Sequence, residues 1–502
     1  MCMAQADPVA STAIRATIRG FWRIKPLAST VCELSYVVQV ALGGSIPKEL
    51  LALRKKQTLS VVLKIQDKYE RNGKLVDAEM RAAFPSPPCI AQLDSSQRLI
   101  VERCRVLEGE EGGEWEPLLS PNPFVTMHIK HAPPAKGERQ IAVGKATATI
   151  DCSAHEAMSW WYAFMSRKNW NTSLEGGDPA LLVAKQATRH DIVVATIKKL
   201  PFPLHNREFV NRCVCVQADT LRDTLGDFFI TSVPVDGGID YGMNPRSVRG
   251  VSISILQFTS SSDSQCTVSY TQKLDAGGQI PTWLVNLKIP EALSGCVNLR
   301  DEFQRDYEID RVERDQLARV ISDEPQTLTP EEEALVNKIQ VKLGMLKDSN
   351  FDSLESPDHL VNMKKLFVDG SSSGVGRASA IIDASVFDCA AWEMSQMMRE
   401  RVRNHGSLER SLTKINDHHA VFHAAYDFAI PGFMPREFLQ SLVWRLQGDQ
   451  LTAVYDSVDR ADFAPSPLYV RGTSMSHILY EKLQVRTRER RASELLTMIA
   501  SR

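Results

Sequence analysis

An internal repeat constrains the fold of this chain more than any other feature of its sequence. The stretch "VGKATATIDCSAHEAMSWW" (143–161) resembles "VGRASAIIDASVFDCAAWE" (375–393), and Asp151 and Asp383 align 232 residues apart. Self-similarity over such a stretch indicates that the chain is built from copies of one structural unit. A chain of 502 residues has room for about three domains, and the repeat predicts that they are related.

Further matches extend the repeat to a third copy near the N-terminus. "PLHNREFVNRCV" resembles "GFMPREFLQSLV", and "SVRG" (247–250) resembles both "YVRG" (469–472) and "TIRG" (17–20). "CTVSYTQKLDAGGQIP" (266–281) resembles "CELSYVVQVALGGSIP" (32–47). The middle copy is complete, whereas the N-terminal copy holds only the end of a unit and the C-terminal copy only its beginning.

The unequal copies and their connectors set the expected domain boundaries. "FPSPP" and "EGEEGGE" indicate a loop, whereas "TLTPEEEALVNKI" carries the capping residues that start a helix. The predicted segments are 14–80 (C-terminal part of a unit), 81–119 (linker), 120–320 (complete unit), 321–355 (helical linker), 356–485 (N-terminal part of a unit) and 486–502 (basic tail).

The middle unit has the pattern of an α+β fold. "KATATID" alternates apolar and polar residues, which is typical of a strand, and "HEAMSWWYAFMSRK" has apolar residues at helical spacing. The runs "DIVVATI", "EFVNRCVCV", "FFITSV", "VRGVSISILQF" and "CTVSYTQKL" are rich in β-branched or aromatic residues, which favours strands. Their short connections predict an antiparallel sheet.

The unit closes with "IPTWLVNLKIPEALSGCVNL" (280–299). We expect a short helix from Pro281, a kink at Pro290 and a longer helix that ends near Phe303. Such a sheet needs cover on its apolar face. The stripe expected to provide it is Leu284, Leu287, Leu293, Val297 and Phe303. The pattern allows either a solidly packed core or a sheet wrapped around the helix with a cavity between them.

Composition argues against several classes of function. The formal net charge is −2, so nothing points to nucleic acid as a partner. The sequence has no run of 18 apolar residues, and "MCMAQADPVA" lacks the blocks of a signal peptide. Its ten cysteines form no CxxC pair, so we expect reduced core cysteines in a cytoplasmic protein.

Three motifs that resemble catalytic or metal sites have plainer explanations. His419 and His423 could hold a metal on a helix, but "HHAVFHAAYDF" has the pattern of a strand. Asp151 ends a strand and is expected to cap the next helix rather than form an acid–base pair with Glu156. "SSGVGRAS" lacks the Lys-Ser/Thr of a phosphate loop. We therefore predict no catalytic residue, no metal and no cofactor.

The middle unit resembles the START (StAR-related lipid transfer) domain family. The resemblance is carried by "REFVNRC", then "VRG" after a loop, then "VSYTQKLDAGGQIPTWLVN", in this order, and parts of it recur in the other two copies. It implies a repeated helix-grip fold, in which a curved antiparallel sheet wraps around a C-terminal helix. It also implies non-enzymatic lipid binding or transfer, with a sterol, phospholipid or sphingolipid as ligand and transient contact with a membrane surface.

The resemblance also implies which residues face the ligand and which form a gate. The expected lipid-binding residues are Phe209, Asn211, Cys213, Cys215, Tyr270, Leu293, Val297 and Arg300, and the expected gate-loop residues within 234–246 are Gly237, Gly238, Tyr241 and Met243. Some family members place an arginine where this chain has Cys213. Arg212, one position earlier, should face the other side of the strand.

Two questions stay open at the level of sequence. The units could be scaffolds with filled cores that serve protein–protein interaction instead of lipid binding. The two incomplete copies could complete one another within or between chains, or they could reflect a shortened reading of a longer repeat array.

Overall fold

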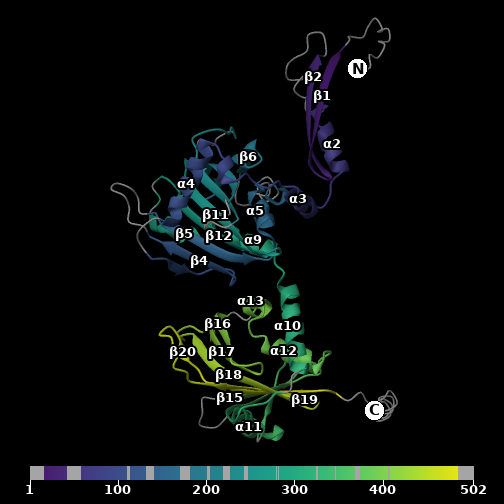
Figure 1. Ribbon diagram of the computed structural model, residues 1–502, viewed down its shortest axis with the longest axis vertical. Helices are drawn as coiled ribbons and strands as arrows, with labels where there is room; N and C mark the ends of the chain where they lie inside the picture. The colour runs from purple at the N-terminus through teal and green to yellow at the C-terminus, as the bar shows by residue number, and fades with distance from the viewer. Residues whose placement is uncertain are drawn as a thin grey trace, which may run out of the picture. The chain divides into compact units, whose positions relative to one another are not determined.

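The structure is a computed structural model that describes residues 16–41, 58–109, 114–131, 141–164, 166–169, 181–200, 204–218, 227–241, 247–278, 280, 282–323, 326–344, 346–367, 374–404 and 407–483. The chain divides into two compact units, Met1–Gln304 and Arg305–Arg502, which we call the N-terminal and C-terminal units (Figure 1).

An antiparallel sheet forms the centre of the N-terminal unit. Its strands follow the order β3-β4-β5-β12-β11-β9-β8-β7-β6, and the short strand β10 pairs with β8 in parallel. The strands are β3 (Glu116–Leu118), β4 (Val125–Lys130), β5 (Val143–Ile150), β6 (Leu181–Thr188), β7 (Asp191–Lys198), β8 (Arg207–Gln217), β9 (Phe228–Pro234), β10 (Val248–Arg249), β11 (Val251–Ser262) and β12 (Gln265–Asp275). The predicted antiparallel sheet is confirmed.

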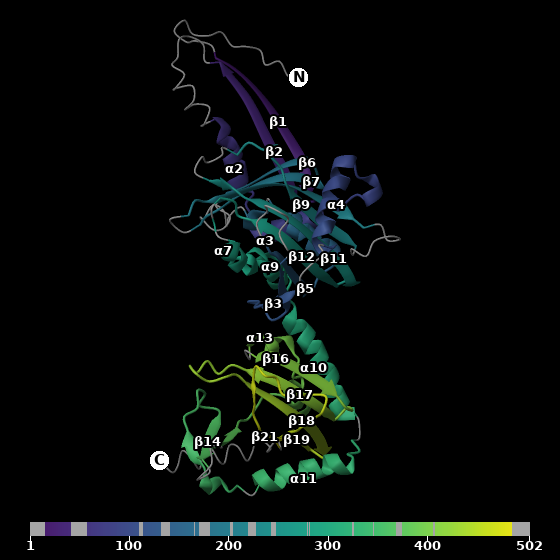
Figure 2. The same ribbon diagram turned by 90° about the vertical axis from the view of Figure 1, so that its left-hand side faces the viewer.

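Helices cover both faces of this sheet (Figures 1 and 2). On the outer face, α4 (Ser95–Gly109) packs Val101 and Cys104 against Phe229 of β9 and Ile255 of β11. The inner face is covered by α5 (Ala154–Tyr162) and by two of the closing helices, α8 (Ile289–Ala292) and α9 (Ser294–Glu302), which follow α7 (Thr282–Leu287). The helix α3 (Gly73–Ala82) contacts α5.

The prediction of a loop over 81–119 was wrong for α4. This stretch has an apolar stripe at helical spacing, which packs against the outer face of the sheet. The buried residues of the stripe are Ile100, Val101, Cys104 and Leu107. The glycine-rich run "EGEEGGE" begins only at the end of the helix. Its glycines mark where α4 stops rather than a loop through the whole segment.

The closing helix is broken, as its prolines predict. Lys288 and Leu293 separate α7, α8 and α9, and Pro290 lies in the first turn of α8, where its missing N–H leaves no helical bond unmade. Val297 and Phe303 pack against the core, as predicted. Leu287 is 66% exposed, so its predicted place in the buried stripe was wrong, because the break after α7 leaves this residue facing solvent. The side chain of Leu284 lies outside the described part of the chain.

An N-terminal hairpin forms a separate two-stranded sheet. β1 (Thr17–Ala28) pairs with β2 (Val31–Ala41), and the helix α2 (Val61–Lys68) follows in the sequence. The rings of Trp22 and Tyr36 stack across the hairpin with centroids 3.9 Å apart. The turn is held by Thr30, whose hydroxyl donates to the carboxylate of Glu79 in α3.

The C-terminal unit has two sheets among its described residues. One consists of β13 (Asp352–Leu354), β14 (Asn362–Phe367) and β15 (Gly374–Ser379), and the other of β16 (Ser407–Lys414), β17 (His419–Tyr426), β18 (Arg436–Gln447), β19 (Gln450–Ser457), β20 (Val470–Arg471) and β21 (Met475–Glu481). The helices are α10 (Asp306–Asp323), α11 (Pro330–Gly344), α12 (Val386–Met394) and α13 (Arg399–Asn404). The predicted start of α11 is confirmed, because Thr329 and Glu332 form the expected reciprocal capping bonds.

The two units share an unusual strand pairing. In the N-terminal unit, β10 runs parallel to β8, with Val248 opposite Arg207. In the C-terminal unit, β20 runs parallel to β18, with Val470 opposite Arg436. The matched "REF" and "VRG" motifs therefore occupy the same positions in both units, in the same register.

Candidate functional site

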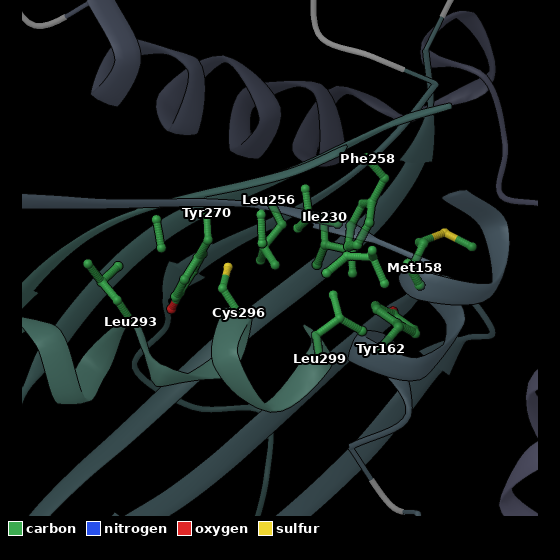
Figure 3. Close-up of a cluster of buried hydrophobic side chains, with 14 of the residues drawn as sticks. Met158, Tyr162, Ile230, Leu256, Phe258, Tyr270, Leu293, Cys296 and Leu299 are labelled. Carbon is green, nitrogen blue, oxygen red and sulfur yellow. The ribbon is translucent and has the colours of Figure 1, made fainter. Parts of the chain in front are cut away.

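One cluster of buried apolar side chains lies between the inner face of the N-terminal sheet and helices α5, α8 and α9. Figure 3 labels Met158, Tyr162, Ile230, Leu256, Phe258, Tyr270, Leu293, Cys296 and Leu299 from this cluster. Leu256 stands opposite Ile230 on one side and Tyr270 on the other, so one row of the pleat crosses three strands. Side chains from the sheet and from the closing helix thus meet directly (Figure 3).

Several predicted ligand-facing residues belong to this cluster. It contains Cys213, Cys215, Tyr270 and Leu293, and Val297 lies at its border. Burial raises the pKa of the Cys213 thiol to about 11 and that of Cys296 to about 12. Both thiols are therefore protonated at neutral pH and act as small apolar groups rather than nucleophiles.

Phe209 and Asn211 occupy the same strand face but have other neighbours. A Cβ atom built on Gly250 would lie 2.3 Å from the Phe209 ring, so this ring packs on the backbone of the strand beside it. Asn211 Nδ2 donates to Ser232 Oγ at 2.8 Å and to the Ser252 carbonyl at 3.1 Å. Asn211 therefore meets polar groups of β9 and β11 on this face.

Arg300 is buried in an ion pair. Its Nη1 lies 3.1 Å from Asp151 Oδ2, and its guanidinium lies 5.2 Å from the ring centroid of Phe124. Asp151 was expected to cap α5, but Ser153 does so by accepting from the Glu156 N–H. Arg300 and Asp151 thus fasten α9 to the end of β5.

Arg212 faces the outer layer, as strand alternation predicts. Its guanidinium donates two hydrogen bonds to Asp191, at 2.9 and 2.6 Å, and a third to Ser96 of α4. The Arg212 guanidinium and Gln97 hold the pKa of Asp191 below its usual range, although burial opposes them by raising it. This arginine anchors α4 and does not face the inner cluster.

The expected gate loop is anchored through Tyr241. The tyrosine hydroxyl donates to Glu208 Oε2 at 2.9 Å, and Arg249 Nε lies 3.2 Å from Glu208 Oε1. Tyr241 was expected to be an apolar loop tip, but this hydrogen bond turns its hydroxyl onto β8. Gly238 has φ +96°, a backbone conformation that favours glycine. Met243 lies outside the described residues.

A small pocket lies beneath the described part of this loop. It has a volume of about 190 Å³ and is lined by Val210, Asp236, Gly237, Ile239, Asp240, Tyr241 and Arg249. Val210 belongs to the outer face of β8, since it alternates with Cys213 and Cys215 of the inner face. This pocket is therefore distinct from the apolar cluster beneath the closing helix.

The sequence did not single out the contacts that seat the closing helix. A Cβ atom on Gly295 would lie 2.3 Å from the ring of Trp161, and one on Gly144 would lie 2.4 Å from Ile289 Cγ2. The ring of Trp161 also contacts that of Tyr270 in a tilted arrangement, with centroids 5.1 Å apart. A glycine within a helical pattern was the available signal, because it marks a close approach.

Other kinds of site find little support in the described part of the chain. It contains no group of three or more metal-ligating side chains, and its cysteines are free thiols. None of its helices is long and apolar enough to cross a membrane. His423 lies on strand β17, as predicted, and contacts Glu437 at 3.2 Å.

The curved antiparallel sheet, with a C-terminal helix seated on its apolar inner face, defines a helix-grip α+β fold. The family model of the START domain matches residues 113–291, from just before β3 to α8. The chain therefore contains a START domain in its N-terminal unit, as the three ordered motifs predicted.

Solved structures with similar folds include several relatives of low identity. Human STARD10 is 18% identical, with a TM-score of 0.32 over 42% of this chain and 82% of its own. Human StAR-related lipid transfer protein 5 is 13% identical, with a TM-score of 0.32 over 41% of this chain and 97% of its own. The di-domain ARO/CYC StfQ from the steffimycin biosynthetic pathway is 12% identical, with a TM-score of 0.19 over 71% and 93%. No curated protein matches the chain.

Proposed function

We propose that the START domain of the N-terminal unit binds one lipid between the inner face of its sheet and the closing helices, and carries or presents it without chemical change. The apolar cluster at that position carries this proposal. There the sheet and a segmented helix face each other through a cluster of apolar side chains, from Tyr270 on β12 to Leu293 and Cys296 on the helix.

The energetics of the cluster suit an apolar chain. Transfer of each methylene from water is worth about 0.8 kcal/mol, so a lipid chain of ordinary length gains enough to be retained. The neutral thiols and aliphatic side chains that line the cluster offer no fixed charge to oppose such a ligand.

Loading requires the closing helix or the gate loop to move. Leu293, Cys296 and Leu299 are each 0% exposed, so their surroundings are filled when no ligand is bound. The breaks at Lys288 and Leu293 divide the helix into short segments that can shift separately. Transient contact with a membrane surface would place the lipid at this opening, in a cytoplasmic setting that suits the free cysteines.

Substitution by tryptophan tests the position of the ligand. Val297→Trp and Cys213→Trp should reduce the lipid recovered with the purified chain several-fold, because each indole fills space that the ligand needs. Extraction followed by mass spectrometry measures the lipid, and circular dichroism checks the fold. Leu287→Trp is the matched control, since Leu287 also belongs to the closing helices, at the end of α7, but is 66% exposed.

Equal lipid content in all three variants and the wild type would place the ligand elsewhere. The second candidate function, a scaffold with a filled core that binds proteins, is favoured by the complete burial of the helix residues named above. Wild-type protein that carries no lipid and accepts none from vesicles would support this scaffold function instead.

A further inference from the structure

We infer that the lipid bound by the START domain has a neutral head group that donates a hydrogen bond, such as a hydroxyl, and is not a phosphodiester. This inference rests on the proposed function and names the ligand class for the same site. It comes from polar side chains at one end of the inner face, where β9 ends at Pro234 and leads to the expected gate loop.

The inner face changes from apolar to polar within a single row of the pleat. The apolar row is Cys215, Ile230, Leu256 and Tyr270, which pair across β8, β9, β11 and β12. The next row is Cys213, Ser232, Ser254 and Gln272 on the same four strands. Asn211 follows, opposite Pro234, where the gate loop begins. A lipid whose chain lies in the apolar cluster would have its head group at this polar end.

Two amide oxygens at the polar end have no partner. Asn211 and Gln272 donate their N–H groups to neighbours, the first to Ser232 and the Ser252 carbonyl, the second to Ser252 Oγ at 2.8 Å. Asn211 Oδ1 and Gln272 Oε1 are buried and accept no hydrogen bond from any described residue. The bond to a backbone carbonyl fixes the orientation of the Asn211 amide, because only its nitrogen can donate.

Buried acceptors without donors are unfavourable, and these two lie together at one end of the inner face, so we assign their missing donor to the bound ligand. A hydroxyl or amide N–H on the ligand would donate to either oxygen. A phosphodiester would not, because it offers only acceptors and would face the two carbonyl oxygens with its negative charge.

The cations on β8 are directed elsewhere. Arg212 is bound to Asp191 on the outer face. Arg207 shares the inner face, but its guanidinium donates to the carbonyl oxygens of His205 and Asn206. Phe209 lies between Arg207 and Asn211 along the strand, packed on Gly250. Burial of an anion requires a paired cation, and the polar row presents none from the described residues.

Matched lipids test this assignment. The full-length chain, stripped of lipid, is offered dioleoylglycerol, its O-methyl ether and dioleoylphosphatidylcholine, and in parallel cholesterol and its methyl ether. At least one hydroxyl lipid should bind about tenfold more tightly than its ether, the effect of one buried acceptor gaining or losing a donor. Phosphatidylcholine should bind more weakly than dioleoylglycerol.

Variants locate the effect. Asn211→Leu and Gln272→Leu should each reduce the ratio of hydroxyl-lipid affinity to ether affinity, because each removes one of the two acceptors that distinguish the ligands. Ser269→Ala, on the opposite face of β12, is the control and should retain the full preference. Two amide variants are used so that poor folding of one, checked by circular dichroism, still leaves the other to decide.

The outcomes separate this inference from the proposed function. Equal binding of hydroxyl lipids and ethers, preference for the phospholipid, or a preference that survives both amide variants would overturn the inference while leaving lipid binding intact. Failure of every probe to bind would overturn both.

Discussion

The repeated motifs "REF" and "RG" are explained by two side-chain contacts in the N-terminal unit. Glu208 is nearly buried and lies 3.2 Å from the Arg249 guanidinium, which fixes β10 beside β8. Phe209 packs against Gly250, where any side chain would collide with its ring. These motifs therefore hold the end of the gate loop to the sheet, and this is why Phe209 lies outside the apolar cluster.

The C-terminal unit makes the same two contacts. Glu437 lies 3.2 Å from Arg471, and a Cβ atom on Gly472 would lie 2.5 Å from the ring of Phe438. Both contacts are made within a single unit, so local packing is enough to account for their recurrence. A motif found twice in one chain thus indicates a shared structural contact before it indicates a shared function.

Gly144 and Gly376 occupy matched positions of the repeat, but replacing each by alanine should affect stability to different extents. Gly144→Ala should destabilise the seat of the closing helix by about 1–3 kcal/mol, because the new Cβ would lie 2.4 Å from Ile289. Gly376→Ala, 232 residues later, should have little effect, because no atom lies within 4 Å of its Cβ position. Hydrogen exchange of β5 and of β15 measures each effect locally. Equal loss of protection in both strands would contradict this packing.

Among the secondary-structure elements, helices α3 and α10 make the same kind of contact, because each supplies a buried aspartate that accepts two backbone hydrogen bonds. Asp77 of α3 accepts hydrogen bonds from the backbone N–H groups of Arg167 and Lys168, just after α5. Asp310 of α10 accepts from the first two N–H groups of α13, just after α12. We infer that α3 and α10 each begin a copy of the repeat. The predicted start of the complete unit at residue 120 would then be too late, because no sequence motif marks a single buried aspartate.

Loss of the hydrogen bond between Tyr241 and Glu208 should loosen the gate loop. Tyr241→Phe removes the hydrogen bond to Glu208 while leaving the ion pair of Glu208 with Arg249. Amide exchange over residues 234–241 should become several-fold faster, and lipid transfer from vesicles should become faster with it. Hydrogen exchange and a fluorescent-lipid transfer assay measure the two rates.

Tyr69→Phe is the control for this change, since Tyr69 is 74% exposed and belongs to the same unit. If amide exchange in the loop is as slow as in the central strands of the wild type, and does not change in Tyr241→Phe, the loop is not a gate.

At the scale of the whole molecule, the two units differ in how far their inner faces are covered. Ile150 of β5 is 0% exposed, whereas Ile382, its counterpart in the repeat, is 63% exposed. β5 pairs with both β4 and β12, whereas β15 pairs only with β14 among the described residues. The described part of the C-terminal unit contains no counterpart of β12 or of the closing helix. Whether the incomplete copies complete one another stays a prediction.

This difference should appear in the native-state exchange of the full-length chain. Amides of β15 should exchange much faster than the matched amides of β5, because an edge strand with an uncovered face opens without breaking a core. Hydrogen exchange with mass spectrometry compares the two strands in one sample. Equal protection would show that β15 is covered by a strand from another chain or from residues that the structure does not describe.

The sequence by itself determined the antiparallel sheet, the broken closing helix and the match of residues 113–291 to the START domain, because alternation, prolines and ordered motifs are local and can be recognised without knowledge of contacts. It also placed Arg212 on the outer face and Cys213 and Cys215 on the inner one, since strand periodicity alone decides a face. The tertiary structure decided the surroundings of each residue that was expected to face inward. Arg300 pairs with Asp151, Leu287 faces solvent, and Asn211 contacts neighbouring polar groups. Those partners lie on strands and helices far apart in the chain, and only their packing brings them together.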